Sequence, residues 1–547
     1  MSTYDKEAPA SARDVIPAIE KAIPNLKIVA PECQRRDYGH GSVVCVCNVT
    51  YCDFAGDIGL PPSGSAFAFE SSKDGLRLAK TSIPLSRAPT HDTSVNDTLL
   101  LVLDSSKRYQ MLYGFGGAFT DAAGINVKSL PEKLQDDLMK SYYGKEGIAY
   151  NMGRVPLAST DFSERKYTYD DSPGDLELTN FTLAQEDLDL KIPYIKKATS
   201  LVTGPLLLIG SAWSSPAWMK TSNTLEGGGV LIGEPGSAYY KSWAKYYVRF
   251  LQEYWRHGIR FYGVTAQNEP TTGFAPNVSW PALGFTAQTQ KEFIKLDMGP
   301  ALDEAGYGAR KIHLLIFDDS SESLPEWSNV VLSDTEAAEY VRGVAVHRYS
   351  DKSVSPAGLD HVHEKFPNKF ILSTQASAGS AAKPEDKVIL GSWERAEEYA
   401  CNIIEDFNHW VNGWIDWNLA LNTEGGPSSV QKSADSPVIV NATAQEFYKQ
   451  PTYYALGQFS KFLPMSTTRV ESHLEQAHSH DTPAKNIHHI AFVAPRMGIV
   501  VIVLNKDDKK YTLKIKDVYR EGTVQKVINA RSITTFVWKA GKPRSPQ

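Results

Sequence analysis

Residues 205–265 contain the pattern that decides the fold. An apolar run, PLLLIGSA, occupies positions 205–212, an amphipathic stretch, YYKSWAKYYVRFLQEYWRH, follows at 239–257, and a second apolar run, RFYGVT, lies at 260–265. The apolar residues of the middle stretch recur at intervals of three and four, which predicts a helix. A strand, a helix and a second strand in this order are typical of a βαβ unit with parallel strands.

The same alternation continues on both sides of this unit, and further helices are predicted at 286–296 and 393–407. Eight strands alternating with helices predict an α/β fold, a (β/α)8 barrel. A doubly wound open sheet is the alternative, but neither a G-x-G-x-x-G motif nor a Walker motif supports it. The glycine-rich GFGGAFTDAA at 114–123 lacks the G-K-[ST] of a phosphate loop. The eight predicted strands are 108–114, 149–156, 205–212, 260–265, 313–317, 343–346, 369–373 and 414–418.

The two ends of the chain have a different pattern. Alternation of the strand type at about 60–107 and 466–540 predicts a β-sandwich assembled from both ends and appended to the barrel. We therefore expect four parts: a polar N-terminal extension at 1–30, a small disulfide-linked N-terminal β element at 31–59, the β-sandwich from 60–107 plus 466–547, and the catalytic barrel at 108–465.

Composition excludes two classes of function. A net charge of −6 and a pI near 6.1 argue against a nucleic-acid binder, which would need a basic face. No run of about 18 apolar residues is present, so no transmembrane segment is expected. The aromatic content of 11% suits either carbohydrate binding or simply a large core. No metal or other cofactor is expected.

Cysteine placement indicates an oxidising compartment. Cys33, Cys45, Cys47 and Cys52 lie within twenty residues, and their spacing fits no common zinc-finger pattern, so two local disulfides are the better interpretation. Cys401 then remains as a predicted buried free thiol. The N-terminus lacks the apolar region of a signal peptide, but five N-x-S/T triplets also favour a lysosomal or secreted protein. These triplets begin at Asn48, Asn96, Asn180, Asn277 and Asn441.

The strongest chemical signal is the segment TAQNEP at 265–270, where the fourth predicted strand ends. Retaining glycosidases with this architecture place the general acid/base glutamate after strand four, and an asparagine just before it holds the sugar 2-hydroxyl. Asn268 and Glu269 occupy these positions. The second carboxylate, which attacks the anomeric carbon, is expected at the end of strand seven. That strand ends Thr374-Gln375-Ala376, without an acidic residue.

Long stretches of the chain, from about Cys33 to Trp538, resemble the glucosylceramidase family of acid β-glucosidases. They include GFGGAFTDAA (114–123), TDFSERKYTYDD (160–171), SAWSSPAW (211–218), LGSWERAEEY (390–399), GWIDWNLALNTEGGP (413–427) and FYKQPTYYALGQFSKF (447–462). The resemblance implies a (β/α)8 barrel with an appended β-sandwich and a small three-stranded N-terminal piece. It implies disulfides Cys33–Cys45 and Cys47–Cys52, and metal-free hydrolysis of glucosylceramide by double displacement. It also implies a saposin-type activator and an anionic membrane surface as partners.

The resemblance assigns roles to individual residues. Glu269 matches the acid/base, residues Asp161, Trp213, Asn268 and Trp417 match those that hold the glucose ring, and Arg154, His347 and Tyr349 match supports around the two carboxylates. Three residues and one loop depart from the family pattern. Gln375 stands where the family has its nucleophilic glutamate, Gln267 replaces an acidic residue, Arg348 replaces an aromatic one, and the loop 428–433 lacks the family's aromatics and asparagine.

An amide cannot replace a carboxylate nucleophile, because it carries no charge to stabilise an oxocarbenium ion and forms no stable glycosyl ester. We therefore expect a chain that binds β-glucosides or glucosylceramide but is weakly active or inactive. The substitution at Gln375 belongs either to an otherwise intact glucosylceramidase or to an inactive pseudo-enzyme that binds glycolipid or a protein partner. An active enzyme that recruits another carboxylate, Asp416 or Glu424, and a structural role without sugar binding are the remaining alternatives.

Overall fold

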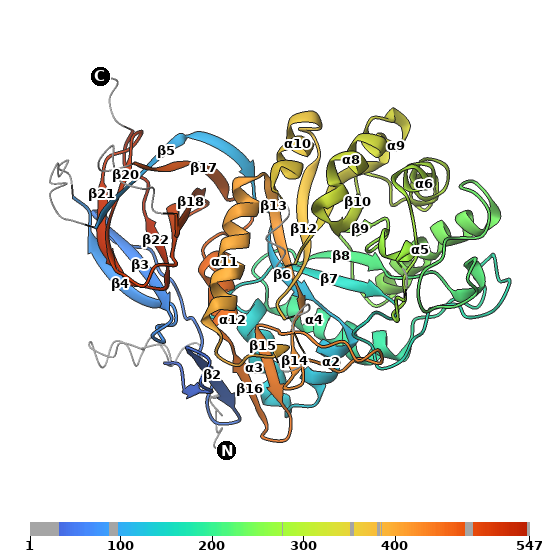
Figure 1. Ribbon diagram of the computed structural model, residues 1–547, viewed down its shortest axis with the longest axis horizontal. Coiled ribbons are helices and arrows are strands. Elements are labelled where there is room, and N and C mark those ends of the chain that lie inside the picture. Colours follow the sequence, from blue (N-terminus) through green and yellow to red (C-terminus); the bar gives the residue numbers. More distant parts are fainter. Residues whose placement is uncertain are drawn as a thin grey trace, which may run out of the picture.

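The structure is a computed structural model that describes residues 32–86, 97–275, 277–349, 355–379, 383, 386–475 and 485–543. The predicted extension at 1–30 and the triplet residue Asn96 lie outside these ranges. Figure 1 shows a barrel on one side of the molecule and a β-rich part on the other, where blue strands from the start of the chain lie beside red strands from its end.

Eight parallel strands close into a barrel in chain order, and the last pairs with the first. Every residue of the second and third barrel strands is buried, as expected for parallel strands covered on both faces. The predicted (β/α)8 barrel is confirmed. Its strands are β6 (Gly114–Ala118), β7 (Met152–Leu157), β8 (Leu207–Ala212), β9 (Gly263–Thr265), β10 (His313–Ser320), β11 (Val341–Tyr349), β12 (Phe370–Ser377) and β13 (Val411–Asn418).

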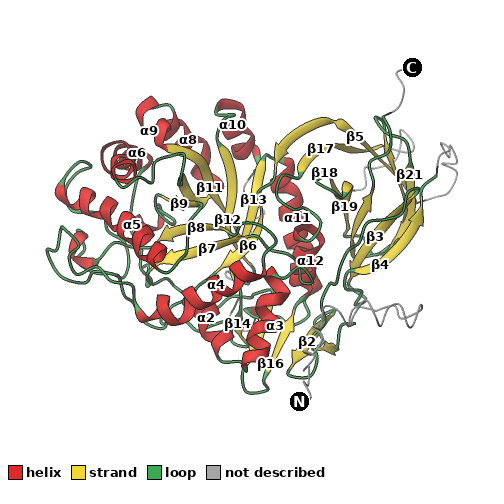
Figure 2. Cartoon of the chain, turned by 180° about the vertical axis from the view of Figure 1, so that it is seen from behind, coloured by secondary structure: helices red, strands yellow, loops and turns green. Residues whose placement is uncertain are grey.

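Helices surround the barrel (Figure 2). In α5 the buried residues include Trp243, Tyr247, Phe250 and Tyr254, whose spacing of three and four residues forms one apolar face against the barrel. None of the helices in the described ranges is long and apolar enough to cross a membrane. The helices are α2 (Asp121–Lys128), α3 (Glu132–Tyr143), α4 (Ile192–Leu201), α5 (Ala238–Arg256), α6 (Ala287–Phe293), α7 (Gly299–Glu304), α8 (Leu324–Leu332), α9 (Thr335–Tyr340), α10 (Ala357–Lys365), α11 (Trp393–Asn408) and α12 (Pro451–Ser460). Short 3-10 or π turns are η1 (Asp187–Lys191), η2 (Ala217–Met219), η3 (Thr272–Phe274), η4 (Ile294–Met298) and η5 (Ser321–Ser323).

The prediction for the first barrel strand was wrong. Residues 108–111 belong to β5 (Thr98–Met111), which pairs outside the barrel, and the barrel begins with the glycine-rich β6. The glycines of β6 permit close contact with neighbouring residues. A Cβ on Gly116 would lie 2.2 Å from the Met152 carbonyl oxygen, and one on Gly117 would lie 2.7 Å from the Leu419 side chain. Glycine in a strand often marks such a close approach of neighbouring residues. The glycine-rich residues of β6 therefore form a strand and not a loop.

Both chain ends build one nine-stranded sheet, as predicted for the β-sandwich. The sheet curls, and its two edge strands meet at a bridge between Ser86 and Thr523. In the central strand β19, Val501 and Val503 face the core of this sheet, whereas Val500 and Ile502 pack on the main core that includes the barrel. The strands, in sheet order, are β21 (Thr523–Ile528), β20 (Tyr511–Asp517), β5, β17 (Thr468–Glu475), β18 (Ile487–Ala494), β19 (Gly498–Asn505), β22 (Ser532–Trp538), β3 (Ser65–Ser72) and β4 (Ala79–Pro84).

The N-terminal β element is larger than the three-stranded piece that the resemblance implies. Its strands β1 (Arg35–Asp37) and β2 (Val43–Asn48) continue into β16 (Glu446–Lys449), β15 (Val438–Asn441) and β14 (Leu421–Asn422), so the sheet has five strands. The disulfides Cys33–Cys45 and Cys47–Cys52 are both present, as predicted. Cys401 is a free thiol, but it is half-buried rather than buried. The sheet therefore ties the N-terminus to the chain segment that follows the last barrel strand.

Candidate active site

A cavity of about 990 Å3 opens at the carboxyl ends of the barrel strands. Five of the predicted site residues line it: Asp161, Glu269, His347, Gln375 and Trp417. The barrel thus brings the ends of its fourth and seventh strands to one cavity, as the sequence predicted. Arg154, Trp213 and Asn268 are buried and contact this group from behind. Tyr349 ends β11, and its side chain lies outside the described part of the structure.

Arg154 links Gln375 to Asn268 and Asp318. Its guanidinium donates hydrogen bonds to the side-chain oxygen of Gln375, to Asn268 Oδ1 at 2.8 Å and to Asp318 Oδ2 at 2.6 Å. The Arg154 side chain is fully buried, so its charge depends on these partners for compensation. Asp318 is the carboxylate among them. Position 375 therefore supplies a neutral oxygen to a buried cation.

A second chain of contacts leads from Asp318 to Glu269. His347 lies between them, with Nε2 at 3.0 Å from Asp318 Oδ1 and Nδ1 at 3.1 Å from Glu269 Oε1. Thr374 and Thr265 each donate a hydrogen bond of 2.6 Å to the Asp318 carboxylate. Asp318 is thus fixed by four groups, and it orients both Arg154 and His347. No role for Asp318 was predicted from the sequence.

The charges of Arg154, Asp318 and His347 stabilise one another. Burial alone would raise the pKa of Asp318, but the charges of Arg154 and His347, together with hydrogen bonds, hold it well below its usual range. Burial favours neutral His347, but the charge and hydrogen bond of Asp318 raise the pKa of the imidazole above its ordinary value. The arrangement therefore favours an ionised Asp318 and a protonated His347 that contacts Glu269.

The backbone at the site is held in an uncommon conformation. Glu269 and Asp318 have φ angles of 40° and 61°, in the left-handed region that costs a residue with a side chain about 1 kcal/mol or more. A hydrogen bond of 2.9 Å from the Glu269 N–H to the Asp318 carbonyl joins the two segments. Backbone strain of this kind clusters at functional sites.

Two tryptophans form an aromatic wall. Trp213 and Trp417 stack with ring centroids 5.1 Å apart and an interplanar angle of 18°. The Arg154 guanidinium lies 5.0 Å from the Trp213 ring centroid and 5.7 Å from that of Trp417. Trp417 faces the cavity, and flat aromatic faces are suited to the apolar C–H face of a pyranose.

Asp161 projects into the cavity from the loop after β7. Its Oδ2 lies 3.2 Å from Lys432 Nζ, while its Oδ1 is buried and has no hydrogen-bond partner in the described residues. An unsatisfied buried carboxylate oxygen is costly unless a ligand donates to it. The oxygen is therefore available to a sugar hydroxyl. The contribution of Lys432 was not predicted from the sequence.

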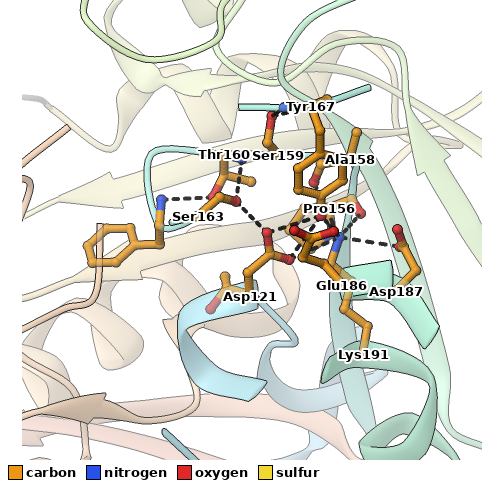
Figure 3. A network of polar contacts seen from close by, with 12 residues as sticks. Asp121, Pro156, Ala158, Ser159, Thr160, Ser163, Tyr167, Glu186, Asp187 and Lys191 are labelled. Atoms are coloured by element: carbon orange, nitrogen blue, oxygen red, sulfur yellow. Dashed lines mark hydrogen bonds and ion pairs between the residues drawn. The ribbon is translucent and has the colours of Figure 1, made fainter. Parts of the chain in front are cut away.

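A buried polar network behind the cavity holds the Asp161 loop (Figure 3). Lys191 is fully buried and pairs with Asp121 and Asp187, each at 3.3 Å, while it donates to the Ala158 carbonyl at 3.2 Å. Asp121 in turn accepts a 2.5 Å hydrogen bond from Ser163, two residues beyond Asp161. Asp121 therefore positions the loop and does not line the cavity.

The two alternative carboxylates are not in the site. Asp416 is buried and accepts a 2.9 Å hydrogen bond from Tyr399, and Glu424 is exposed. Neither lines the cavity. The interpretation that one of them replaces the missing nucleophile was therefore wrong. The Gln267 amide nitrogen, with two N–H donors, lies within hydrogen-bonding distance of the backbone carbonyls of Ala212, Trp213 and Asn268, where an ionised carboxylate could not donate.

A closed parallel barrel with a β-sandwich and a glutamate after its fourth strand defines a glycoside hydrolase architecture. Residues 112–463 match the TIM-barrel domain of glycosyl hydrolase family 30, and residues 467–536 match its beta sandwich domain. The chain is 42% identical over 511 residues to the lysosomal acid glucosylceramidase of Mus musculus, covering 93% of this chain and 96% of that protein. It is 41% identical over 507 residues to putative glucosylceramidase 4 of Caenorhabditis elegans, covering 92% and 94%. This chain belongs to the glucosylceramidase family.

A solved structure has a similar fold. The crystal structure of SrfJ from Salmonella typhimurium superposes with a TM-score of 0.76 at 24% identity, covering 87% of this chain and 99% of that one. At this level of identity the likeness concerns the fold alone. The barrel and the β-sandwich therefore occur together in both proteins.

Proposed function

We propose that this chain binds β-glucosides, glucosylceramide among them, in the cavity at the barrel mouth and hydrolyses them slowly or not at all. The observation that carries the proposal is that Glu269 and Gln375 line one cavity. Gln375 contacts Arg154 and Glu269 contacts His347, and the buried Asp318 contacts both Arg154 and His347. The general acid/base position is intact. The nucleophile position holds an amide.

In the family reaction, the carboxylate at position 375 would attack the anomeric carbon while Glu269 protonates the leaving oxygen. Glu269 would then deprotonate a water that releases the sugar. An amide at 375 forms no stable glycosyl ester, so the first step fails. Losing this covalent route slows the reaction by roughly 10³-fold or more, which corresponds to about 4 kcal/mol of transition-state stabilisation.

The sugar-binding groups support retained ligand binding. Trp417 offers an aromatic face, Asp161 an unpaired acceptor oxygen, and Asn268 sits next to Glu269 under the guanidinium of Arg154. All three side chains are at least nine-tenths buried and fixed by neighbours. A preorganised site loses little conformational freedom on binding, which favours affinity.

Two measurements on the unmodified chain test the proposal. Isothermal titration with p-nitrophenyl β-D-glucoside should detect saturable binding that Trp417→Ala weakens, whereas the α-anomer should bind more weakly. Release of 4-methylumbelliferone from its β-glucoside at acidic pH should stay far below the 1–10³ s⁻¹ typical of enzymes. Turnover within that range would contradict the proposal, and so would the absence of any binding.

A pseudo-enzyme that binds glycolipid or a protein partner is the second candidate. It is favoured by the changes around the cavity, where Lys432 pairs with Asp161 and Arg348 pairs with Asp406 at 2.7 Å. Lysosomal or secreted location and the use of a saposin-type activator or an anionic membrane surface are part of the proposal by family resemblance. Restoring a glutamate at 375 separates the two candidates, because a remodelled pseudo-enzyme would stay inactive.

A further inference from the structure

Lys432 brings a positive charge into the part of the cavity proposed to hold the sugar. Its ammonium lies 3.2 Å from Asp161 Oδ2 and 3.7 Å from the centroid of the Trp280 ring. The side chain is 39% exposed and lines the cavity. An ammonium has three N–H donors, and the carboxylate contact engages one of them. An N–H that points neither to Asp161 nor to the Trp280 ring can donate to a ligand in the cavity.

The loop that carries Lys432 is fastened to the loop that carries Asp161. Ser428 Oγ donates a 2.5 Å hydrogen bond to the Asp161 carbonyl and accepts one of 3.2 Å from the Lys432 N–H. The Ser429 N–H donates to the Ser163 carbonyl at 2.8 Å. These contacts hold the backbone of the Lys432 loop against the Asp161 loop before any ligand binds, as a specific binding site requires.

Cations and carboxylates both line the cavity. Besides Lys432, the cations are Lys387, Arg395 and Arg348, and the carboxylates are Asp161, Glu269, Asp319, Glu322 and Glu398. Burial first, and then the charge of Lys432, lower the pKa of Lys387, which indicates two ammonium groups close enough to repel each other. An anion placed at Lys432 would reduce this repulsion.

The carboxylates that balance the two arginines lie away from the cavity. Arg395 pairs with Asp435 and Arg348 pairs with Asp406, and neither aspartate lines the cavity. Asp161 is the carboxylate within ion-pairing distance of Lys432 in the described residues. Because Asp161 Oδ1 has no hydrogen-bond partner among the described residues, it can accept a hydrogen bond from a hydroxyl group while Oδ2 remains in contact with Lys432.

We infer that the sugar held by this cavity carries an anionic group, with a β-D-glucuronide as the ligand class. The inference rests on the proposed function of the same cavity. A glucuronide has a hydroxyl and a carboxylate on adjacent ring carbons. The hydroxyl donates to Asp161 Oδ1 and the carboxylate accepts from Lys432, a combination that an uncharged glucoside cannot offer. A phosphate or sulfate at the same end of the sugar has related chemistry.

Equilibrium binding to the unmodified chain tests this inference. Isothermal titration compares p-nitrophenyl β-D-glucuronide, the β-D-glucoside and the β-D-glucoside 6-phosphate. A charge-assisted hydrogen bond predicts that the glucuronide binds about tenfold or more tightly than the glucoside. Preference for the 6-phosphate over the glucuronide would overturn the carboxylate assignment. Equal or weaker binding of both anionic ligands would overturn the inference while leaving the proposed function intact. Absence of binding by all three would overturn both.

Variants of Lys432 identify the group responsible. Lys432→Gln should abolish the preference for the glucuronide, whereas Lys432→Arg, which keeps the charge, should retain most of it. Lys133→Met is the matched control, because it removes one lysine charge from an exposed pair with Asp137 outside the cavity. Circular dichroism confirms that each variant folds. An unchanged ligand preference in folded Lys432→Gln would overturn the role of Lys432.

Discussion

The substitution Gln375→Glu should convert this chain into an active β-glucosidase. The surroundings of position 375 are suited to a carboxylate, because Arg154 already donates a hydrogen bond to the side-chain oxygen there. Gln375 is 4% exposed, so a carboxylate would be ionised only with such a cationic partner. Glutamate has nearly the same shape as glutamine. We therefore expect the variant to fold normally and its new carboxylate to face Glu269 across the cavity.

The size of the effect follows from the lost covalent route. A missing nucleophile costs about 10³-fold or more in kcat/KM, or about 4 kcal/mol, and the substitution should restore at least this factor. Binding should change less, because the aromatic wall of Trp213 and Trp417 and the Asp161 acceptor are untouched. The gain should thus appear mainly in kcat, as for an interaction made in the transition state.

The assay measures release of 4-methylumbelliferone from its β-D-glucoside between pH 4 and 7, for the unmodified chain and for Gln375→Glu. Proton NMR of the first sugar product should show the β-anomer, because a double displacement retains configuration. A Gln375→Glu chain that also carries Glu269→Gln serves as the control. It should lose the restored activity, which shows that both carboxylates act in one site.

Two results would refute the reasoning. Ordinary turnover by the unmodified chain would show that position 375 does not supply the nucleophile. A folded Gln375→Glu variant that binds the glucoside but gains less than tenfold in kcat/KM would show that the groups around the two carboxylates no longer support catalysis. The second result would favour the pseudo-enzyme.

Two further predictions concern stability. Burial raises the pKa of Asp416 to about 8, so the folded state holds a proton that the unfolded state has released above about pH 4. The free energy of unfolding should therefore fall as the pH rises from 4 to 8. Asp416→Asn keeps the Tyr399 contact but has no proton to release, so it should lack a part of this fall on the order of 5 kcal/mol. Urea titrations at several pH values measure the difference. A slope equal to that of the unmodified chain would contradict the assignment. Lys191→Met should destabilise the fold by about 3 kcal/mol or more in the same assay, because it leaves Asp121 and Asp187 buried without their cation. Unchanged glucoside binding by a folded Lys191→Met chain would show that this network does not position the Asp161 loop.

Much of the barrel could be predicted because its signals are local. The helical spacing at 239–257 and 393–407 gave α5 and α11 to within a residue or two, and the apolar run at 205–212 gave β8. The first strand could not be found in this way. Glycine has no side chain to contribute to an apolar pattern, and the reason for Gly116 is the carbonyl of Met152 on the neighbouring strand. Only the folded arrangement shows that contact.

In the candidate site, too, the features encoded by local sequence patterns could be predicted, and those formed by distant residues could not. Position 269 could be placed opposite 375 because the carboxyl ends of all barrel strands share one face. The role of Asp318 was not predicted, because it depends on side chains from four other strands that converge on one carboxylate. The contact of Lys432 with Asp161 joins residues 271 positions apart, and no local pattern encodes it.

Gln375 and Lys432 shift the charge of the cavity in the same direction. With an amide at 375, Asp318 is the carboxylate that pairs with the Arg154 guanidinium among the described residues, and Lys432 adds a cation to the cavity lining. Both features favour an anionic ligand, so restoring a glutamate at 375 should weaken the preference for a glucuronide even though Lys432 is unchanged. Titration of Gln375→Glu with the thioglycoside forms of the glucuronide and the glucoside, which resist hydrolysis, measures this ratio. A preference as strong as that of the unmodified chain would show that Lys432 acts alone, because a new carboxylate in the same cavity would otherwise oppose the anion.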